Sequence, residues 1–146
     1  MPQINFFVED VKFSLKNKAA LHRWITSAAK KEGYKIQALN YIFCSDKFLH
    51  TLNEEYLHHD NYTDIITFDL SSRDKDPKTR NLSGEIFISI DRIKENAKIF
   101  NVSFQDELHR VIIHGVLHLC GYSDKTKKDK AGMRVKENYY LNLRSF

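Results

Sequence analysis

Residues 114–124 read His114-Gly115-Val116-Leu117-His118-Leu119-Cys120-Gly121-Tyr122-Ser123-Asp124. A helix advances about 100° per residue, so histidines four positions apart stand on the same face of it. The glycine three residues after His118 can adopt the left-handed conformation that ends a helix, and the chain can then turn back and bring Asp124 to the same place. Two imidazoles and a carboxylate leave the fourth position of a zinc ion open, as in catalytic sites. The spacing therefore predicts one divalent metal ion per chain, zinc, held by His114, His118 and Asp124.

A purely structural interpretation of these residues stays open. The chain has 7 histidines among 146 residues, so a pair at this spacing is common by chance. Both rings would then bond to backbone carbonyls in the core, and Asp124 would be an ordinary residue after a helix end. The glycine and the aspartate at fixed distances favour the metal site.

The elements around this stretch predict an α+β fold. Residues 111–119 are apolar almost all round, apart from the histidines, which indicates a buried central helix, and Ser103-Phe104-Gln105-Asp106 before it resembles a capping box. Strands are expected at 4–8, 35–44, 65–70 and 85–90, and helices at 16–31, 45–56 and 91–100. A last helix carries Met133, Val135, Tyr139, Tyr140 and Leu143. Residues 71–81 lack apolar side chains and predict an exposed, mobile loop. We expect a four-stranded mixed sheet packed with helices, with the buried metal-binding helix in the C-terminal half.

At these residues the chain resembles a known family. His114–Tyr122 looks like the signature of the YbeY family, bacterial zinc-dependent endoribonucleases implicated in ribosomal RNA maturation. Leu52-Asn53-Glu54-Glu55-Tyr56, then Asp60 and Thr63-Asp64-Ile65-Ile66-Thr67-Phe68, is similar to a second block of that family, in the same order and at a similar distance. Gly84-Glu85-Ile86 is similar to its Gly-Asp-Ile strand. The resemblance implies the same fold, a zinc cofactor and single-strand-directed cleavage of ribosomal RNA precursors.

The chain departs from the family pattern at three positions. The family's third ligand is a histidine, where this chain has Asp124, and a carboxylate would weaken the pull of the metal on a bound water. The family's arginine after the tyrosine is Leu57 here, so a phosphate contact at that position is in doubt. The family's proline before Thr-Asp is Tyr62.

Length and composition indicate a globular protein of one domain, residues 1–146. The chain is 42% hydrophobic and 12% aromatic, which excludes a disordered protein. It has no apolar run near 18 residues and no signal peptide at its start, so we expect no membrane partner. Only Cys44 and Cys120 are present, which excludes a disulfide framework and favours the cytoplasm.

The net charge of +4 is concentrated just after the predicted metal site. Such a run is often only a solvated helix face, but its position favours binding of RNA. The candidate substrate-binding residues are Lys125, Lys127 and Lys128 in this run, together with His58 and His59 after the second family block.

The residue after His114 bears on the class of bond that the site could hydrolyse. Zinc metalloproteases carry a glutamate there as general base, whereas this chain has Gly115, so a peptide or small-molecule hydrolase is disfavoured. A zinc-activated water attacking a phosphodiester needs less help from a protein base. The alternative is a metal-stabilised factor that binds RNA or the ribosome with little nuclease activity. Glu107 and Arg110 lie on the side of His114 and could support it through hydrogen bonds, although a surface ion pair is the plainer interpretation.

Overall fold

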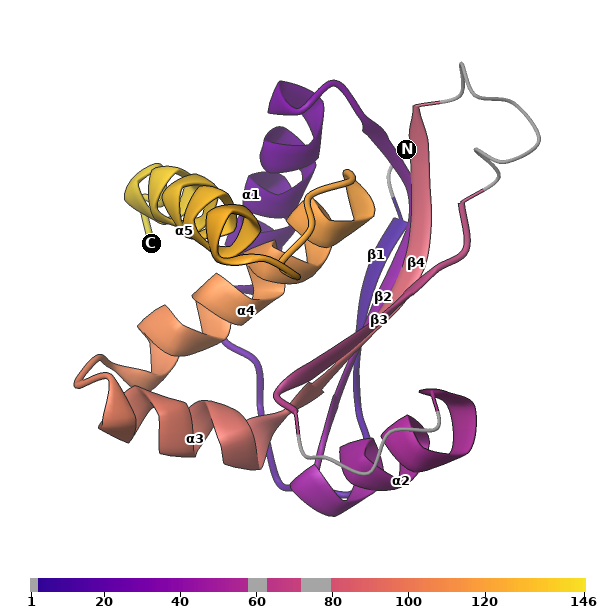
Figure 1. Cartoon of the computed structure of the whole chain (residues 1–146), viewed down its shortest axis with the longest axis vertical. Coiled ribbons are helices and arrows are strands. Elements are labelled where there is room, and N and C mark those ends of the chain that lie inside the picture. The colour runs from indigo at the N-terminus through magenta and orange to yellow at the C-terminus, as the bar shows by residue number, and fades with distance from the viewer. Residues whose placement is uncertain (1–2, 58–62, 72–79) are drawn as a thin grey trace.

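A computed structural model describes residues 3–57, 63–71 and 80–146, and within these ranges the chain forms four strands and five helices (Figure 1). The strands are Gln3–Val8 (β1), Lys35–Cys44 (β2), Ile65–Asp69 (β3) and Asn81–Ser89 (β4). The helices are Lys18–Lys31 (α1), Asp46–Leu57 (α2), Ile90–Ile99 (α3), Phe104–Leu119 (α4) and Lys127–Asn142 (α5). Within the described ranges, none of these helices combines the length and apolar character needed to cross a membrane.

The sheet has the strand order β1-β2-β4-β3. Strands β1, β2 and β4 run parallel, and β3 lies antiparallel on the outside of β4. The expected four-stranded mixed sheet is therefore confirmed. Its last strand begins at Asn81 and not at the predicted residue 85, because Lys35 of β2 pairs with Asn81 and the ladder continues beyond the apolar run.

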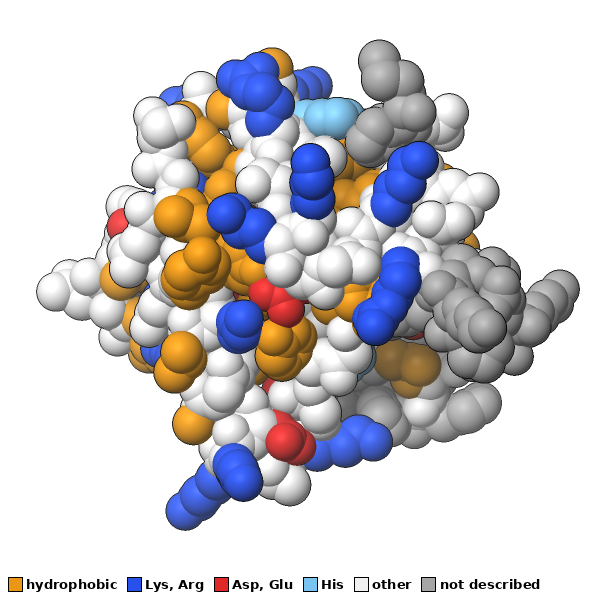
Figure 2. Space-filling view, turned by 90° about the horizontal axis from the view of Figure 1, so that it is seen from above, with side chains coloured by type: hydrophobic (Ala, Val, Ile, Leu, Met, Phe, Trp, Pro, Cys, Tyr) orange, Lys and Arg blue, Asp and Glu red, His pale blue; other side chains and the backbone are white. Residues whose placement is uncertain are grey.

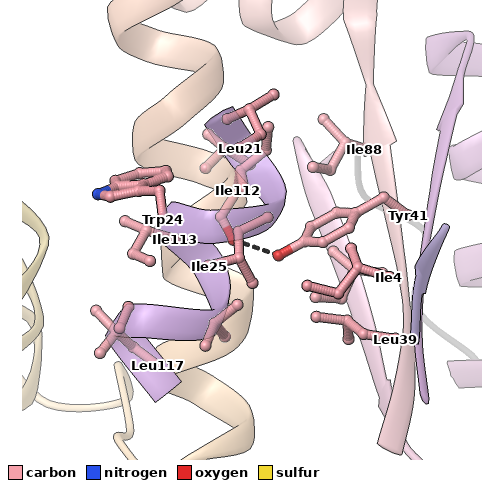
Figure 3. Close-up of a cluster of buried hydrophobic side chains, with 14 of the residues drawn as sticks. Ile4, Leu21, Trp24, Ile25, Leu39, Tyr41, Ile88, Ile112, Ile113 and Leu117 are labelled. Atoms are coloured by element: carbon pink, nitrogen blue, oxygen red, sulfur yellow. Dashed lines mark hydrogen bonds between the residues drawn. The ribbon is translucent and has the colours of Figure 1, made fainter. Parts of the chain in front are cut away.

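The two faces of the sheet are covered by different helices. Ile86 and Ile88 of β4 point into the main core with α1 and α4, whereas Phe87 between them packs with α2 on the other face, as the alternation of a strand requires. Figure 1 shows α1, α4 and α5 stacked on one side of the sheet and α2 on the other. In the main core, the buried Tyr41 hydroxyl donates to the carbonyl of Ile112 at 3.0 Å, which joins β2 to α4 (Figure 3).

Helix α4 is the buried central helix that the sequence predicts, with ten buried residues among its sixteen. It lies close to the sheet at Gly115, where an added Cβ would come within 2.8 Å of the Ile86 side chain. A larger residue would push the helix off β4. Gly115 therefore sets the distance between the helix that carries both histidines and the sheet.

The two ends of α4 differ in how they match the predicted caps. Ser103 caps the start by accepting from the Asp106 N–H, but the Asp106 carboxylate accepts from Arg144 at 3.0 Å, so the expected capping box gives way to a tertiary ion pair. At the other end Gly121 has φ 104°, and the N–H groups of Gly121 and Tyr122 bond back to the carbonyls of His118 and Leu117. This is the left-handed glycine stop expected from the sequence.

Candidate metal centre

The last turns of α4, the turn after it and helix α5 together form the candidate site. The Oδ2 atom of Asp124 lies 3.5 Å from Nε2 of His114. A nitrogen and an oxygen bound to one tetrahedral zinc at the usual bond lengths lie about 3.4 Å apart. The turn at Gly121 thus brings these two donor atoms to the separation that a shared metal requires.

The other ring nitrogen of His114 contacts a residue of α5. His114 Nδ1 lies 2.7 Å from Oε2 of Glu137, a carboxylate buried between the two helices. When Nδ1–H donates to this carboxylate, Nε2 carries the lone pair and faces Asp124. Carboxylates in this position orient the histidine ligands of metal sites and raise their basicity.

Arg110, one turn before His114 on α4, donates to Oε1 of Glu137 at 2.9 Å and to Asn138 at 2.7 Å. The sequence favoured a surface ion pair for Arg110. In the structure its partner is instead Glu137, which is buried and contacts His114. Glu137 was not singled out from the sequence. The sequence does contain one indication of its role, since Glu137 lies on the otherwise apolar stripe of α5 between Met133 and Tyr140. A carboxylate in such a position is buried only when it has a partner, so a partner for Glu137 could have been expected.

His118 stands on the same face of α4 but apart from this pair. Its ring is parallel to that of His114, with an angle of 8° and 6.5 Å between centroids. Two imidazoles on one tetrahedral zinc have their centroids about 5 Å apart, so His118 must turn about its side-chain bonds to share a metal. Its exposure leaves room for that rotation. Across residues 3–57, 63–71 and 80–146, no three His, Cys, Asp or Glu side chains form a ready metal-binding group.

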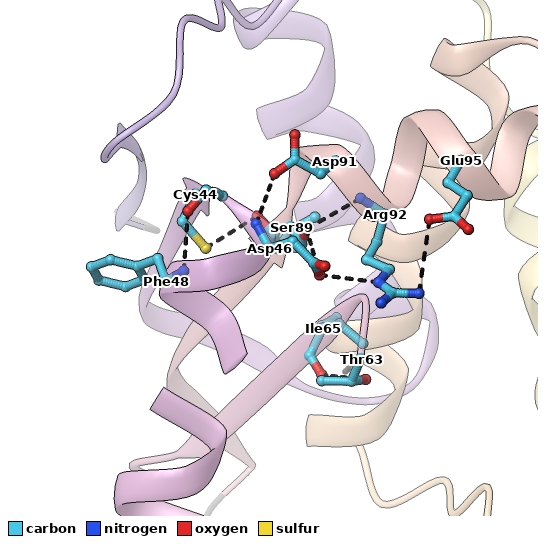
Figure 4. Close-up of polar contacts among 11 residues, drawn as sticks. Cys44, Asp46, Phe48, Thr63, Ile65, Ser89, Asp91, Arg92 and Glu95 are labelled. Atoms are coloured by element: carbon cyan, nitrogen blue, oxygen red, sulfur yellow. Dashed lines mark hydrogen bonds and ion pairs between the residues drawn. The ribbon is translucent and has the colours of Figure 1, made fainter. Parts of the chain in front are cut away.

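A cavity of about 330 Å³ opens beside His114, and Thr63, Asp64 and Ile65 from the later part of the second family block line it. Thr63 and Asp64 precede β3, and the carbonyl of Asp64 accepts from the N–H of Ser89 at 3.0 Å. The hydroxyl of Ser89 accepts from the Arg92 N–H, and Arg92 in turn donates to Asp46 (Figure 4). The junction of β4 and α3 therefore holds Asp64 in the wall of the cavity. The sequence alone did not predict this position of Asp64.

Burial and charge act in opposite directions on the groups of this cavity. Burial raises the pKa of Asp64, and burial together with the charge of Asp64 raises the pKa of Glu107. Burial disfavours the charged form of His114, but the hydrogen bond to Glu137 and the nearby carboxylates raise its pKa overall. The cavity accordingly concentrates negative charge around His114, an environment that suits a cation.

The predicted substrate-binding lysines lie on the surface beside the site. Lys125 belongs to the turn after α4, and Lys127 and Lys128 begin α5; all three are exposed. Lys130 lines another hollow of the surface together with His114 and Asp124. Figure 2 shows Lys and Arg side chains spread over the face seen from above, with few acidic side chains among them. His58, His59 and Tyr62 lie outside the described residues, as do residues 72–79 of the predicted loop.

Comparisons with known proteins decide the family of this chain. A family model described as Endoribonuclease YbeY matches residues 3–144. The chain belongs to the YbeY family. Among the relatives named Endoribonuclease YbeY, the one from Cytophaga hutchinsonii is 51% identical over 98% of this chain and 96% of its own length. The one from Amoebophilus asiaticus is 45% identical over 97% of this chain and 94% of its own length.

The structural comparison agrees with the family. The solution structure of TM1509 from Thermotoga maritima matches 96% of this chain and 87% of its own with a TM-score of 0.65 and 30% identity. These findings confirm the resemblance, the α+β fold and the enzyme class, an endoribonuclease that hydrolyses phosphodiester bonds in RNA. The YbeY family is metal-dependent, which agrees with the expectation of a metal cofactor.

Proposed function

We propose that this chain uses His114, His118 and Asp124 to hold one zinc ion and cleaves single-stranded ribosomal RNA precursors. The observation that carries the proposal is the environment of His114, whose Nδ1 meets the buried Glu137 while its Nε2 faces Asp124 at 3.5 Å. A buried carboxylate behind one ring nitrogen and a second carboxylate before the other is the arrangement of a metal-ligating histidine.

The chemistry divides between the metal and the protein. A zinc ion lowers the pKa of water and polarises a phosphoryl oxygen. Glu137 keeps His114 in the tautomer that ligates through Nε2, and Arg110 holds Glu137. Gly115 provides no base in the position that metalloproteases use, which supports a phosphodiester over a peptide as substrate.

Charge, cysteine content and packing support the proposed RNA partner, the cellular location and the single domain. The net charge of +4 and the exposed lysines beside the site support binding to ribosomal RNA precursors or a ribosomal subunit. With Cys44 and Cys120 as its two cysteines, the chain has too few for a disulfide framework, which supports a cytoplasmic location. One buried cluster that reaches from Ile4 to Leu141 supports a single metallohydrolase domain over residues 1–146.

The test is cleavage of defined single-stranded and duplex RNA by metal-replete and chelator-treated protein, with a His114→Ala/His118→Ala variant alongside. We expect cleavage of the single strand only, its loss with chelator and its recovery with zinc. The variant should bind no zinc and stay inactive. RNA cleavage by this variant would show that His114 and His118 are not needed for activity. RNA binding without cleavage by any form of the protein would identify an RNA-binding maturation factor.

A further inference from the structure

The cavity at His114 continues into a second hollow of about 390 Å³ between the α3–α4 turn and α5. The two hollows share four residues in their walls, Phe100, Glu107, Arg110 and Arg134. The two hollows therefore adjoin at these residues and make one groove that extends from His114 to Asn142.

Phe100 presents an aromatic ring to this groove. It follows the last turn of α3 and is 53% exposed although it lies in the wall of both hollows. Its neighbours Ile99 and Val102 are also exposed. A flat apolar ring left open to solvent inside a polar groove suits a planar ligand that stacks on it.

Arg134 is the most exposed of the three arginines that line this groove. The guanidinium groups of Arg110 and Arg144 lie 2.9 and 3.0 Å from the carboxylates of Glu137 and Asp106. Arg134 lies 4.0 Å from Glu137, and its side chain is 54% exposed. Arg134 also lines the hollow that contains His114, Asp124 and Lys130, so it lies beside the candidate metal site.

We propose that this groove, which we call the Phe100 groove, binds one nucleotide next to the cleaved phosphate, with its base stacked on Phe100 and its phosphate against Arg134. The inference rests on the proposed function, because the strand enters the groove from the site at His114. Stacking on an aromatic ring accepts any base and needs an unpaired one, which accounts for a preference for single strands. Arg134 would also give the strand a guanidinium contact, whereas the position of the family's arginine after the tyrosine is Leu57 in this chain.

The stacking contact is tested by equilibrium binding of a single-stranded oligoribonucleotide to metal-free protein, which separates binding from cleavage. Phe100→Ala should weaken binding by about tenfold, and Phe100→Trp should retain it. Ile99→Ala is the matched control, since Ile99 is adjacent and 65% exposed but lies in the wall of neither hollow. Equal binding by Phe100→Ala and wild type would overturn the proposal.

The phosphate contact is tested by the salt dependence of the same binding. Loss of one phosphate contact to a single strand lowers the slope of log K against log salt by about 0.7. We expect this change in Arg134→Gln and no change in the charge-matched Lys98→Gln on the surface of α3. The same slope for Arg134→Gln and wild type would show that Arg134 contacts no phosphate of the bound strand.

Oligonucleotides with a single abasic position assign the stacked base. One abasic position should weaken binding to the wild type, and Phe100→Ala should lose nothing further with that oligonucleotide, as expected for partners in one contact. Independent losses would contradict the stacking. If wild type binds in this way but cuts no RNA, the proposed function fails and the groove stands. If wild type cuts RNA and Phe100→Ala binds like it, the groove fails and the function stands.

Discussion

His114 joins three elements through one side chain, because its ring contacts Glu137 of α5 at one nitrogen and Asp124 of the intervening turn at the other. Asp124 is also the position where this chain departs from the family pattern. Its carboxylate is half-exposed, so it can be exchanged without opening the core. The residue therefore offers a direct test of the third ligand.

Asp124→Ala should release the metal, because it removes the carboxylate oxygen that lies 3.5 Å from His114 Nε2. Asp124→His should retain the metal, since an imidazole is an equally good zinc ligand. Metal content after dialysis measures both, with Ser123→Ala as the neighbouring control. Full metal content in Asp124→Ala would show that the third ligand lies elsewhere.

His109 is the third histidine of α4 and has a separate role. Burial, followed by the charge of Arg144, lowers its pKa to about 4, while Asp106 acts in the opposite direction. Its Nδ1 atom accepts from Arg144 at 2.7 Å, and its ring packs between Trp24 and Phe146. The folded chain therefore keeps this ring neutral at pH values where the unfolded chain protonates it.

Between about pH 6.5 and 4 the unfolded state binds one more proton than the folded state at this residue. The free energy of unfolding should therefore fall as the pH falls through this window, by up to about 3 kcal/mol from His109. His109→Phe should remove this part of the pH dependence. Urea unfolding of both proteins from pH 7.5 to 4.5 measures it, and parallel curves would contradict it.

At the scale of elements, one carboxylate joins the end of α1 to the turn before Asp124 and to helix α5, the two segments on either side of the candidate metal site. Glu32 accepts from the hydroxyls of Tyr122, at 2.7 Å, and Tyr140, and from Lys136 at 3.3 Å. Burial raises the pKa of Glu32, but these three hydrogen bonds lower it overall. Tyr122 is two residues before Asp124, so this contact also fixes the turn that carries the proposed ligand.

Glu32→Gln keeps the shape of the side chain and removes the charge that these donors share. We expect the free energy of unfolding to fall by about 1–3 kcal/mol and metal to be lost at a lower chelator concentration. Denaturant unfolding and a chelator titration measure the two effects, with the exposed Glu55→Gln of α2 as control. Unchanged metal retention with lower stability would limit Glu32 to a structural role.

At the scale of the whole molecule, the net charge of +4 is unevenly distributed. Replacing Lys125, Lys127, Lys128 and Lys130 together with Gln should weaken RNA binding at low salt and flatten its salt dependence by about 0.7 per lost phosphate contact. A control variant with Lys12, Lys16, Lys18 and Lys94 replaced has the same net charge and leaves the lysine run intact. If both variants lose the same amount of RNA affinity, only the total charge of the protein matters and the lysine run is a solvated surface.

Local patterns in the sequence were enough to predict the elements of the site. The bounds of β2 agree with the prediction at both ends. Gly121 follows the end of α4 and has the expected positive φ. The alignment of His114 with His118 follows from the helical period. These features depend on backbone geometry within a few residues, so a single sequence is sufficient to predict them.

The partners of His114 depend instead on how distant segments pack. Glu137 lies 23 residues further along the chain and reaches Nδ1 only because α5 packs against α4. Asp64 reaches the cavity because β3 pairs with β4, and the start of β4 at Asn81 depends on pairing with β2. Such contacts depend on the positions of whole elements, which periodicity cannot encode, and therefore only the folded chain joins Asp64, His114 and Glu137 in one site.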